Sequence, residues 1–272
     1  MEIVRRSENG VYHLYFSVCN GAMDLIHCQK LLVEYQIAIE NPDCKVIILW
    51  GGEDFFSNGI DLNSIHKQYN PTILAYKNLK AINKLVKAIL TTKNKLTIAG
   101  IRGPAAAGGV MLALACDLRY ARKATVFNPS YVNMGLSGSE YWSILLPSMI
   151  GFGKTQKLVY EGSPISAQQA LDLGLIHHEG CLDHERFEKE VTLKAKFLAN
   201  TNIKARLATK AVLNKRLLQD VHEQVLFELQ QMKDCCNNME FTEARTDFAE
   251  KRKPASNRQF LSVSSEYLKR HQ

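Results

Sequence analysis

The chain has 272 residues, of which 46% are hydrophobic and 22% are charged, and its formal net charge is +7. This composition supports one large domain with a packed core and argues against a disordered chain. No apolar run is long enough to span a bilayer, and the first ten residues lack the apolar core of a signal peptide. We therefore expect a protein of the cytoplasm that does not enter a membrane.

The cysteines and the basic charge narrow the class of ligand. Seven cysteines are scattered along the chain without a C-x-x-C pair, so reduced thiols are expected instead of a disulfide framework, and no metal is expected. The excess of Lys and Arg suits either a phosphate-bearing small ligand or nucleic acid. Because no aromatic and basic recognition motif accompanies it, nucleic acid is the less favoured partner. The basic cluster at 251–258 is interpreted as a solvated tail.

Strands and helices are predicted to alternate through the first half of the chain. The strands are expected at 11–18, 45–50, 95–101, 118–122 and 125–129, and the helices at 22–40 and 72–92. This alternation predicts crossover units and an α/β core. From about residue 139 onward the pattern indicates helix almost throughout, with long amphipathic segments across 183–232.

Two loops that contain glycine each follow a predicted buried strand. "FFSNGID" follows the strand at 45–50, and "PAAAGGVMLALACD" at 104–117 opens an apolar helix with a glycine pair. The first N–H groups of a helix have no internal partner, and glycine lets a ligand approach the backbone closely. Two such loops can each offer one N–H to a single oxygen, which is an oxyanion hole. Taken alone, the glycines could equally serve only close helix packing.

Several strings resemble the crotonase (enoyl-CoA hydratase/isomerase) superfamily across essentially the whole chain. They are "FFSNGIDL" at 55–62, "IRGPAAAGGVMLALACDLRYA" at 101–121, "FNPSYVNMG" at 127–135 and "SAQQALDLGLI" at 166–176. The resemblance implies a crotonase-type ββα spiral core over 1–200 and a C-terminal helical region at 201–272 that caps the core and drives assembly into homotrimers or hexamers. It also implies an acyl-CoA substrate, so that coenzyme A enters as part of the substrate.

The resemblance assigns roles to particular residues of the two glycine loops. The thioester oxygen would lie between the backbone N–H groups of Ile60 and Gly108, which form the oxyanion hole. Further substrate contacts are implied at Ala22, Met23, Ser57, Asn58, Gly59, Gly109 and Met111.

The carboxylates that hydrate a double bond are predicted to be missing. Enoyl-CoA hydratases of this superfamily place one glutamate in the helix after the glycines and a second one after the following strand. By motif these positions hold Met111 and Tyr131. Neither a thioether nor a neutral phenol acts as a base near neutral pH. We therefore expect the fold and the oxyanion hole without enoyl-CoA hydration.

Glu140 is the carboxylate that remains near the predicted site. On its own it is typical of an acidic residue at a helix start, and Tyr131 is typical of a buried aromatic. However, "GGEDFFSNGIDLNSI" and "GSEYWSILLP" resemble the C-terminal module of the HypX (HoxX) family of hydrogenase maturation proteins. That resemblance implies that Tyr131 and Glu140 are the catalytic pair and that formyl-CoA is decarbonylated to CO and CoA. Since no formyltransferase-like module is recognised in these residues, a partner enzyme is expected to supply formyl-CoA.

Two alternatives stay open. The first is another CoA-thioester lyase or isomerase that uses Glu140 as its sole acid–base group. The second is a non-catalytic CoA-binding scaffold, and a role in RNA binding would rest on the basic charge alone.

Overall fold

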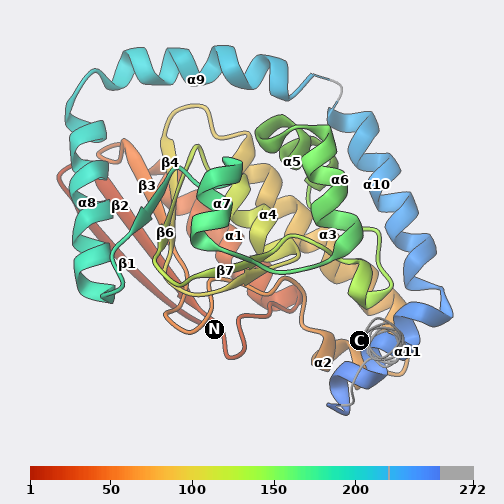
Figure 1. Cartoon of the computed structure of the whole chain (residues 1–272). Coiled ribbons are helices and arrows are strands. Elements are labelled where there is room, and N and C mark those ends of the chain that lie inside the picture. Colours follow the sequence, from red (N-terminus) through yellow and green to blue (C-terminus); the bar gives the residue numbers. More distant parts are fainter. Residues whose placement is uncertain (220, 252–272) are drawn as a thin grey trace, which may run out of the picture.

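A six-stranded sheet organises the fold, in the order β1-β2-β3-β4-β6-β9 (Figure 1). The computed structural model describes residues 1–219 and 221–251, so all but the first residue of the predicted basic tail lies outside it. The strands of this sheet are β1 (Glu2–Glu8), β2 (Val11–Ser17), β3 (Val46–Trp50), β4 (Leu96–Ile101), β6 (Leu118–Arg122) and β9 (His178–Gly180). All of its neighbouring strands are parallel except β1 and β2.

A smaller sheet holds β5 (Ala105–Ala106), β7 (Val126–Asn128) and β8 (Ile165–Ser166). The five predicted strands are therefore present, and each of their ends lies within one residue of the prediction. The prediction did not include β1, which pairs with β2 through a two-residue turn at Asn9 and Gly10, both with positive φ. Asn-Gly is the sequence that such a hairpin turn favours.

The helices surround the main sheet. They are α1 (Leu25–Glu40), α2 (Leu62–His66), α3 (Pro71–Leu90), α4 (Gly108–Leu114), the 3₁₀ turn η1 (Val132–Met134), α5 (Trp142–Ile150), α6 (Phe152–Glu161), α7 (Ala167–Leu173), α8 (His184–Asn200), α9 (Ile203–Leu217), α10 (Val221–Cys236) and α11 (Met239–Ala249). Among the described residues beyond 139, the expectation of predominant helix is confirmed, with β8 and β9 as the exceptions. Those strands have two and three residues and are held by pairing with β7 and β6, so no local pattern reveals them.

Strand β3 is buried along its whole length because helices cover both of its faces. Ile47 and Leu49 belong to the large core that also contains side chains of α1, α3 and α4. Val46, Ile48 and Trp50 belong to a second core beneath α8. A strand that is covered on both faces requires an unbroken apolar run, which explains the sequence VIILW.

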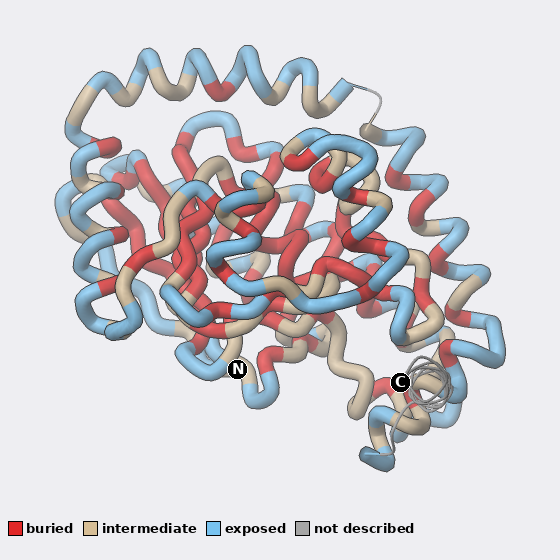
Figure 2. The backbone as a smooth tube through the Cα atoms, viewed as in Figure 1, coloured by how far each residue is buried: buried red, intermediate tan, exposed pale blue. Residues whose placement is uncertain are grey.

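Helix α4 lies in the centre of the molecule, and each of its seven residues is buried (Figures 1 and 2). Apolar neighbours on every side leave no place for a polar side chain, which explains the sequence after the glycine pair. Gly109 lies against the backbone of the preceding loop: a Cβ at this position would be 2.0 Å from the Ser57 carbonyl oxygen. Close packing of the two loops therefore requires glycine at 109.

The C-terminal helices lie on the outside of the core (Figure 1). Helix α10 packs against α3 and α5, and α11 packs against α2 and η1. Helix α9 is exposed along most of its length, and its one buried residue, Lys210, donates to Asp117 Oδ2 at 2.7 Å. The predicted boundary at residue 200 coincides with the end of α8, and assembly into trimers or hexamers stays a prediction. Within residues 1–219 and 221–251, every helix is too short or too polar to cross a bilayer.

Substituting Gly109 should test the close approach of the two loops. We expect Gly109→Ala to lower the free energy of unfolding by about 3 kcal/mol, because the clash is with backbone that cannot rotate away. Gly153→Ala is the matched control, since nothing lies within 4 Å of a Cβ built at that position in α6. It should raise the free energy of unfolding by about 0.5–1 kcal/mol. Urea denaturation measures both changes, and equal stability of the two variants would contradict the close approach.

Candidate active site

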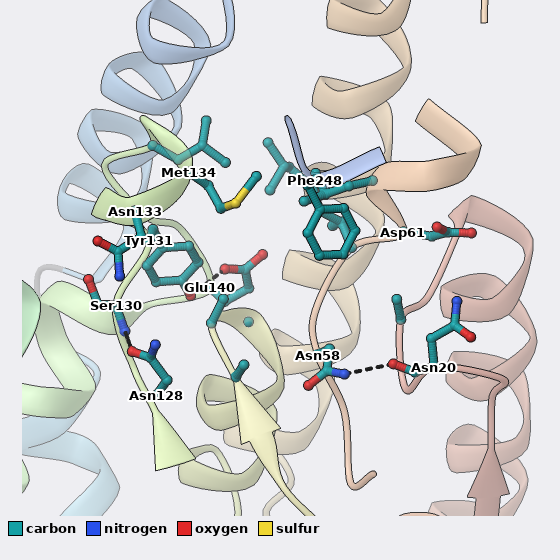
Figure 3. A pocket seen from close by; sticks show the side chains of 18 of the residues that line it. Asn20, Asn58, Asp61, Asn128, Ser130, Tyr131, Asn133, Met134, Glu140 and Phe248 are labelled. Atoms are coloured by element: carbon teal, nitrogen blue, oxygen red, sulfur yellow. Dashed lines mark hydrogen bonds between the residues drawn. The ribbon is translucent and has the colours of Figure 1, made fainter. Parts of the chain in front are cut away.

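A cavity of about 530 Å³ lies where the loop before α2, the start of α4, η1 and the end of α11 meet (Figure 3). Six of the residues singled out from the sequence line it: Ala22, Asn58, Ile60, Gly108, Tyr131 and Glu140. They come from segments more than a hundred residues apart in the chain, and the fold brings them to one place.

Glu140 and Tyr131 point toward one another at one wall of the cavity (Figure 3). The Tyr131 hydroxyl donates to Glu140 Oε2 at 2.7 Å, and its oxygen lies 3.3 Å from the Ser139 carbonyl oxygen. The Glu140 carboxyl also touches the start of α4, because a Cβ on Gly108 would be 3.0 Å from Glu140 Cδ. Because glycine has no side chain, position 108 leaves room for the Glu140 carboxyl beside the backbone.

Burial governs the proton affinity of this pair. Glu140 is 1% exposed, and the loss of water raises the pKa of its carboxyl from 4.5 to about 7, although the hydrogen bond from Tyr131 acts in the opposite direction. Burial, followed by the charge of Glu140, raises the pKa of Tyr131 well above its ordinary value. Tyr131 therefore stays protonated and donates, while Glu140 can take up or release a proton near neutral pH.

Ile60 and Gly108, whose backbone N–H groups are the predicted donors, both line the cavity. Met23 bonds to the residues on either side of Ile60, through Gly59 O at 2.8 Å and the Asp61 N–H at 3.0 Å. In such a parallel bridge the N–H of Ile60 points away from Met23 and is not used by the bridge. Gly108 is the first residue of α4, so its N–H has no partner within the helix.

The two donor loops touch one another at their glycines. A Cβ on Gly59 would be 3.2 Å from the Gly108 backbone nitrogen. Ala107, which precedes the helix, has φ of 46°, a conformation that L-residues rarely adopt, and its N–H donates to Asn128 O at 2.8 Å. This strained turn fixes the direction in which the α4 backbone begins. The arrangement can supply two N–H donors to one oxygen.

Five residues predicted to contact substrate do not line the cavity: Met23, Ser57, Gly59, Gly109 and Met111. The structure gives most of them a supporting position instead. Met23 forms an isolated parallel β-bridge with Ile60, and Ser57 Oγ accepts the Gly59 N–H at 3.2 Å. Met111 is completely buried in α4.

Other lining residues were not identified from the sequence. Asn128, Ser130, Asn133 and Met134 lie within or beside the string "FNPSYVNMG", which therefore already marked this wall. Leu79, Met232 and Phe248 come from α3, α10 and α11, whose amphipathic patterns do not distinguish a lining residue from a core residue.

The acidic side chains that line the cavity, among the described residues, are Glu140 and Asp61. Asp61 caps α2, since its Oδ1 accepts the N–H groups of Asn63 at 3.0 Å and Ser64 at 3.2 Å. Glu140 is thus the carboxyl available for proton transfer. Within the same described residues, His, Cys, Asp and Glu side chains form no group of three that could hold a metal ion.

Glu140→Gln should stabilise the protein more at pH 8 than at pH 5. A carboxyl whose pKa is raised by folding is compatible with the folded state mainly in its neutral form. Its ionisation therefore lowers the free energy of unfolding, and this loss develops as pH rises from about 4.5 to about 7 and is constant above. Gln keeps an oxygen that can accept the hydrogen bond from the Tyr131 hydroxyl, and it carries no charge. We expect its stability advantage over the wild type to grow by about 2 kcal/mol between pH 5 and pH 8.

Thermal or urea unfolding of both proteins at the two pH values measures this difference. Glu223→Gln, at an exposed site in α10, is the control that should show no such pH dependence. A stability difference between wild type and Glu140→Gln that does not change with pH would show that Glu140 is not held in a buried site.

Comparisons with known proteins identify the family and the fold. The model of the enoyl-CoA hydratase/isomerase family matches residues 22–259. HypX from Aquifex aeolicus, solved in complex with tetrahydrofolic acid, is 35% identical with a TM-score of 0.88 over 93% of this chain. Hydrogenase maturation factor HoxX from Bradyrhizobium diazoefficiens is 39% identical over 64% of this chain. An enoyl-CoA hydratase from Bacillus halodurans shares the fold, with 24% identity and a TM-score of 0.81 over 90% of this chain and 98% of its own.

The chain corresponds to only part of the two hydrogenase maturation proteins. The match covers 46% of the HypX chain and 31% of HoxX. The resemblance to the HypX family noted in the sequence is nevertheless confirmed, as is the predicted α/β fold with its crotonase-type core. The chain belongs to the enoyl-CoA hydratase/isomerase family.

Proposed function

We propose that the cavity binds a short acyl-CoA and that Glu140 is its acid–base group. The observation that carries this proposal is the buried Glu140 carboxyl, which is hydrogen-bonded to Tyr131 at 2.7 Å and touches the backbone of Gly108. A proton-transfer group and a hydrogen-bond donor for a carbonyl oxygen are thereby close enough to act on the same small acyl group. General acid–base catalysis of this kind contributes roughly 10²–10⁴-fold to a rate.

The reaction that we propose is the decarbonylation of formyl-CoA. The Ile60 and Gly108 N–H groups hold the formyl oxygen, and ionised Glu140 takes the formyl proton, while the C–H electron pair stays on carbon. The C–S bond then breaks with its electron pair on sulfur, which leaves CO. Glu140 returns the proton to the thiolate, so that the products are CO and CoA. Atoms, electrons and protons balance without an added oxidant or metal.

Tyr131 supports this cycle through its hydrogen bond. Because the phenol stays protonated, it donates to Glu140 Oε2 and stabilises the negative charge of the carboxylate. It also lowers the proton affinity that burial alone would give the carboxyl. The pair is therefore poised to take up a proton and to give it back near neutral pH.

The similarity to HypX and HoxX supports a place for this reaction in hydrogenase maturation. Since the chain spans less than half the length of those proteins, that setting is part of the proposal. An activity of the formyltransferase class would supply the formyl-CoA. We also propose that the protein acts in the cytoplasm.

A second candidate is a proton shuttle in an acyl-CoA isomerisation. The size and walls of the cavity favour it, because 530 Å³ and the side chains of Leu136, Met232 and Phe248 offer an apolar space larger than a formyl group requires. One carboxyl suffices for such a shuttle. Crotonyl-CoA hydration remains unexpected, since the acidic residues among those described that line the cavity are Glu140 and Asp61, and Asp61 is engaged in capping α2.

We propose, finally, that the protein assembles as a homotrimer or a dimer of trimers. Large apolar side chains on the outer helices support this, notably Leu193 of α8, Val212 of α9 and Phe227 of α10, which are 68%, 73% and 60% exposed. Large apolar side chains that are exposed on a single chain are covered when they lie in an interface between chains.

Wild-type protein given formyl-CoA should release CO and free CoA, and Glu140→Gln should abolish the release. Gln has the size of Glu and lacks its basicity, so CoA affinity should change little. Haemoglobin trapping measures CO, and calorimetry measures CoA binding. Release by the wild type no faster than the spontaneous rate would exclude decarbonylation. Isomerisation of a short enoyl-CoA by the wild type, abolished in Glu140→Gln, would then favour the second candidate, whereas CoA binding without turnover would favour a scaffold.

Tyr131→Phe should slow CO release less than Glu140→Gln and move its pH dependence toward alkaline pH. The wild-type rate should rise with pH to a plateau with a midpoint of about 7, because the ionised carboxyl is the base. Loss of the phenol removes a hydrogen bond that favours ionisation, so the midpoint rises. The pH dependence of kcat/KM for both proteins provides the test. A midpoint that stays in place or falls would show that Tyr131 does not support the charge on Glu140.

A further inference from the structure

The backbone that carries Glu140 is held in an unfavourable conformation. Glu140 and the next residue, Tyr141, have φ of 63° and 66°, so two consecutive residues with side chains occupy the left-handed region. Each such residue costs roughly 1–2 kcal/mol relative to the right-handed region. A turn of this kind persists only where surrounding groups hold it in place.

Two buried side chains from other helices hold this turn. Asn83 of α3 accepts the Glu140 N–H on Oδ1 at 2.7 Å. Glu228 of α10 accepts the Tyr141 N–H on Oε2 at 3.1 Å, and its Oε1 accepts the Ser143 N–H at 2.9 Å and the Ser143 hydroxyl at 2.5 Å. Glu228 is 4% exposed, so its carboxylate is enclosed and satisfied by these three donors.

We propose that Glu228 is a positioning residue for Glu140, fixing the turn that directs the Glu140 carboxyl at Gly108 and placing a second negative charge near it. This inference rests on the proposed role of Glu140 as the acid–base group. Glu228 does not line the cavity, so it acts through Tyr141 and the start of α5 and not on the substrate. Glu228, from the C-terminal helix α10, thereby orients the Glu140 carboxyl of the core.

The groups around Glu140 make Glu228 its charged neighbour: burial raises the pKa of the Glu228 carboxyl, while its hydrogen bonds from Ser143 and Tyr141 act in the opposite direction and favour the carboxylate. Tyr131 contacts the carboxyl from the loop before η1 and stays protonated. Cys28 faces it from α1, and burial, followed by the charge of Glu140, raises the pKa of this thiol, which therefore stays neutral. Glu228 raises the pKa of Glu140 through its charge, after the larger effect of burial. Removing that charge should make Glu140 easier to ionise.

The test is a titration of Glu140 in the Glu228→Gln variant. Protein is labelled with ¹³C at the glutamate carboxyl, and the Glu140 signal is assigned by its absence in Glu140→Gln. We expect the Glu140 midpoint to fall below that of the wild type. At pH 8, where Glu140 is ionised in both proteins, CO release should fall about tenfold with KM unchanged, because the turn is less well held. Glu223→Gln on the exposed side of the same helix should alter neither quantity.

Ser143→Ala provides a milder change should Glu228→Gln fail to fold. It removes the hydroxyl donor that favours the charged form of Glu228, so Glu228 is less fully ionised and the Glu140 midpoint should move in the same direction by less. An unchanged Glu140 midpoint in the variant that folds would overturn the proposal. Since the titration requires no turnover, a shifted midpoint in protein that releases no CO would sustain the role of Glu228 and reject the decarbonylation.

Discussion

The close approach of two backbone loops is the contact on which the site depends. The Ala106 N–H donates to Ser57 O at 2.9 Å, and the start of α4 follows immediately. Gly109 has no room for a side chain beside the Ser57 carbonyl, and Gly59 lies against the Gly108 nitrogen. Because the loops touch at backbone atoms, Ile60 and Gly108 come to line the same cavity, and the Glu140 carboxyl finds space beside Gly108.

The site concentrates features that reduce stability. A carboxyl is buried where its charged form is disfavoured, and Ala107, Glu140 and Tyr141 all have positive φ. Strain and buried charge of this kind are typical of functional sites, where the surrounding structure holds them. Here the surroundings include a fully buried α4 and the two polar anchors Asn83 and Glu228, each of which accepts a hydrogen bond from the strained turn.

The C-terminal helices complete the site as well as covering the core. Met232 of α10 and Phe248 of α11 line the cavity, and Glu228 of α10 anchors the turn at Glu140. Helix α11 is held near the cavity by its packing on η1, where Gly135 has φ of 65° and a Cβ would lie 2.7 Å from the Phe241 nitrogen. The shape of the cavity and the position of the Glu140 carboxyl therefore both depend on how these helices pack.

The sequence by itself determined the α/β class, most strands, the two glycine loops and the identity of Glu140 and Tyr131 as candidates, because each has a local signal: an apolar run, a glycine punctuation or a family string. It did not reveal β8 and β9, which are too short to show a periodicity and exist through pairing with β7 and β6. It also assigned substrate contact to Met23 and Met111, which the structure places in the core outside the cavity lining. Only the tertiary structure decided that Glu140 is buried beside Gly108 and that Glu228, from a helix almost ninety residues later, holds its turn, because burial and contact arise from the packing of distant segments and leave no mark on local sequence.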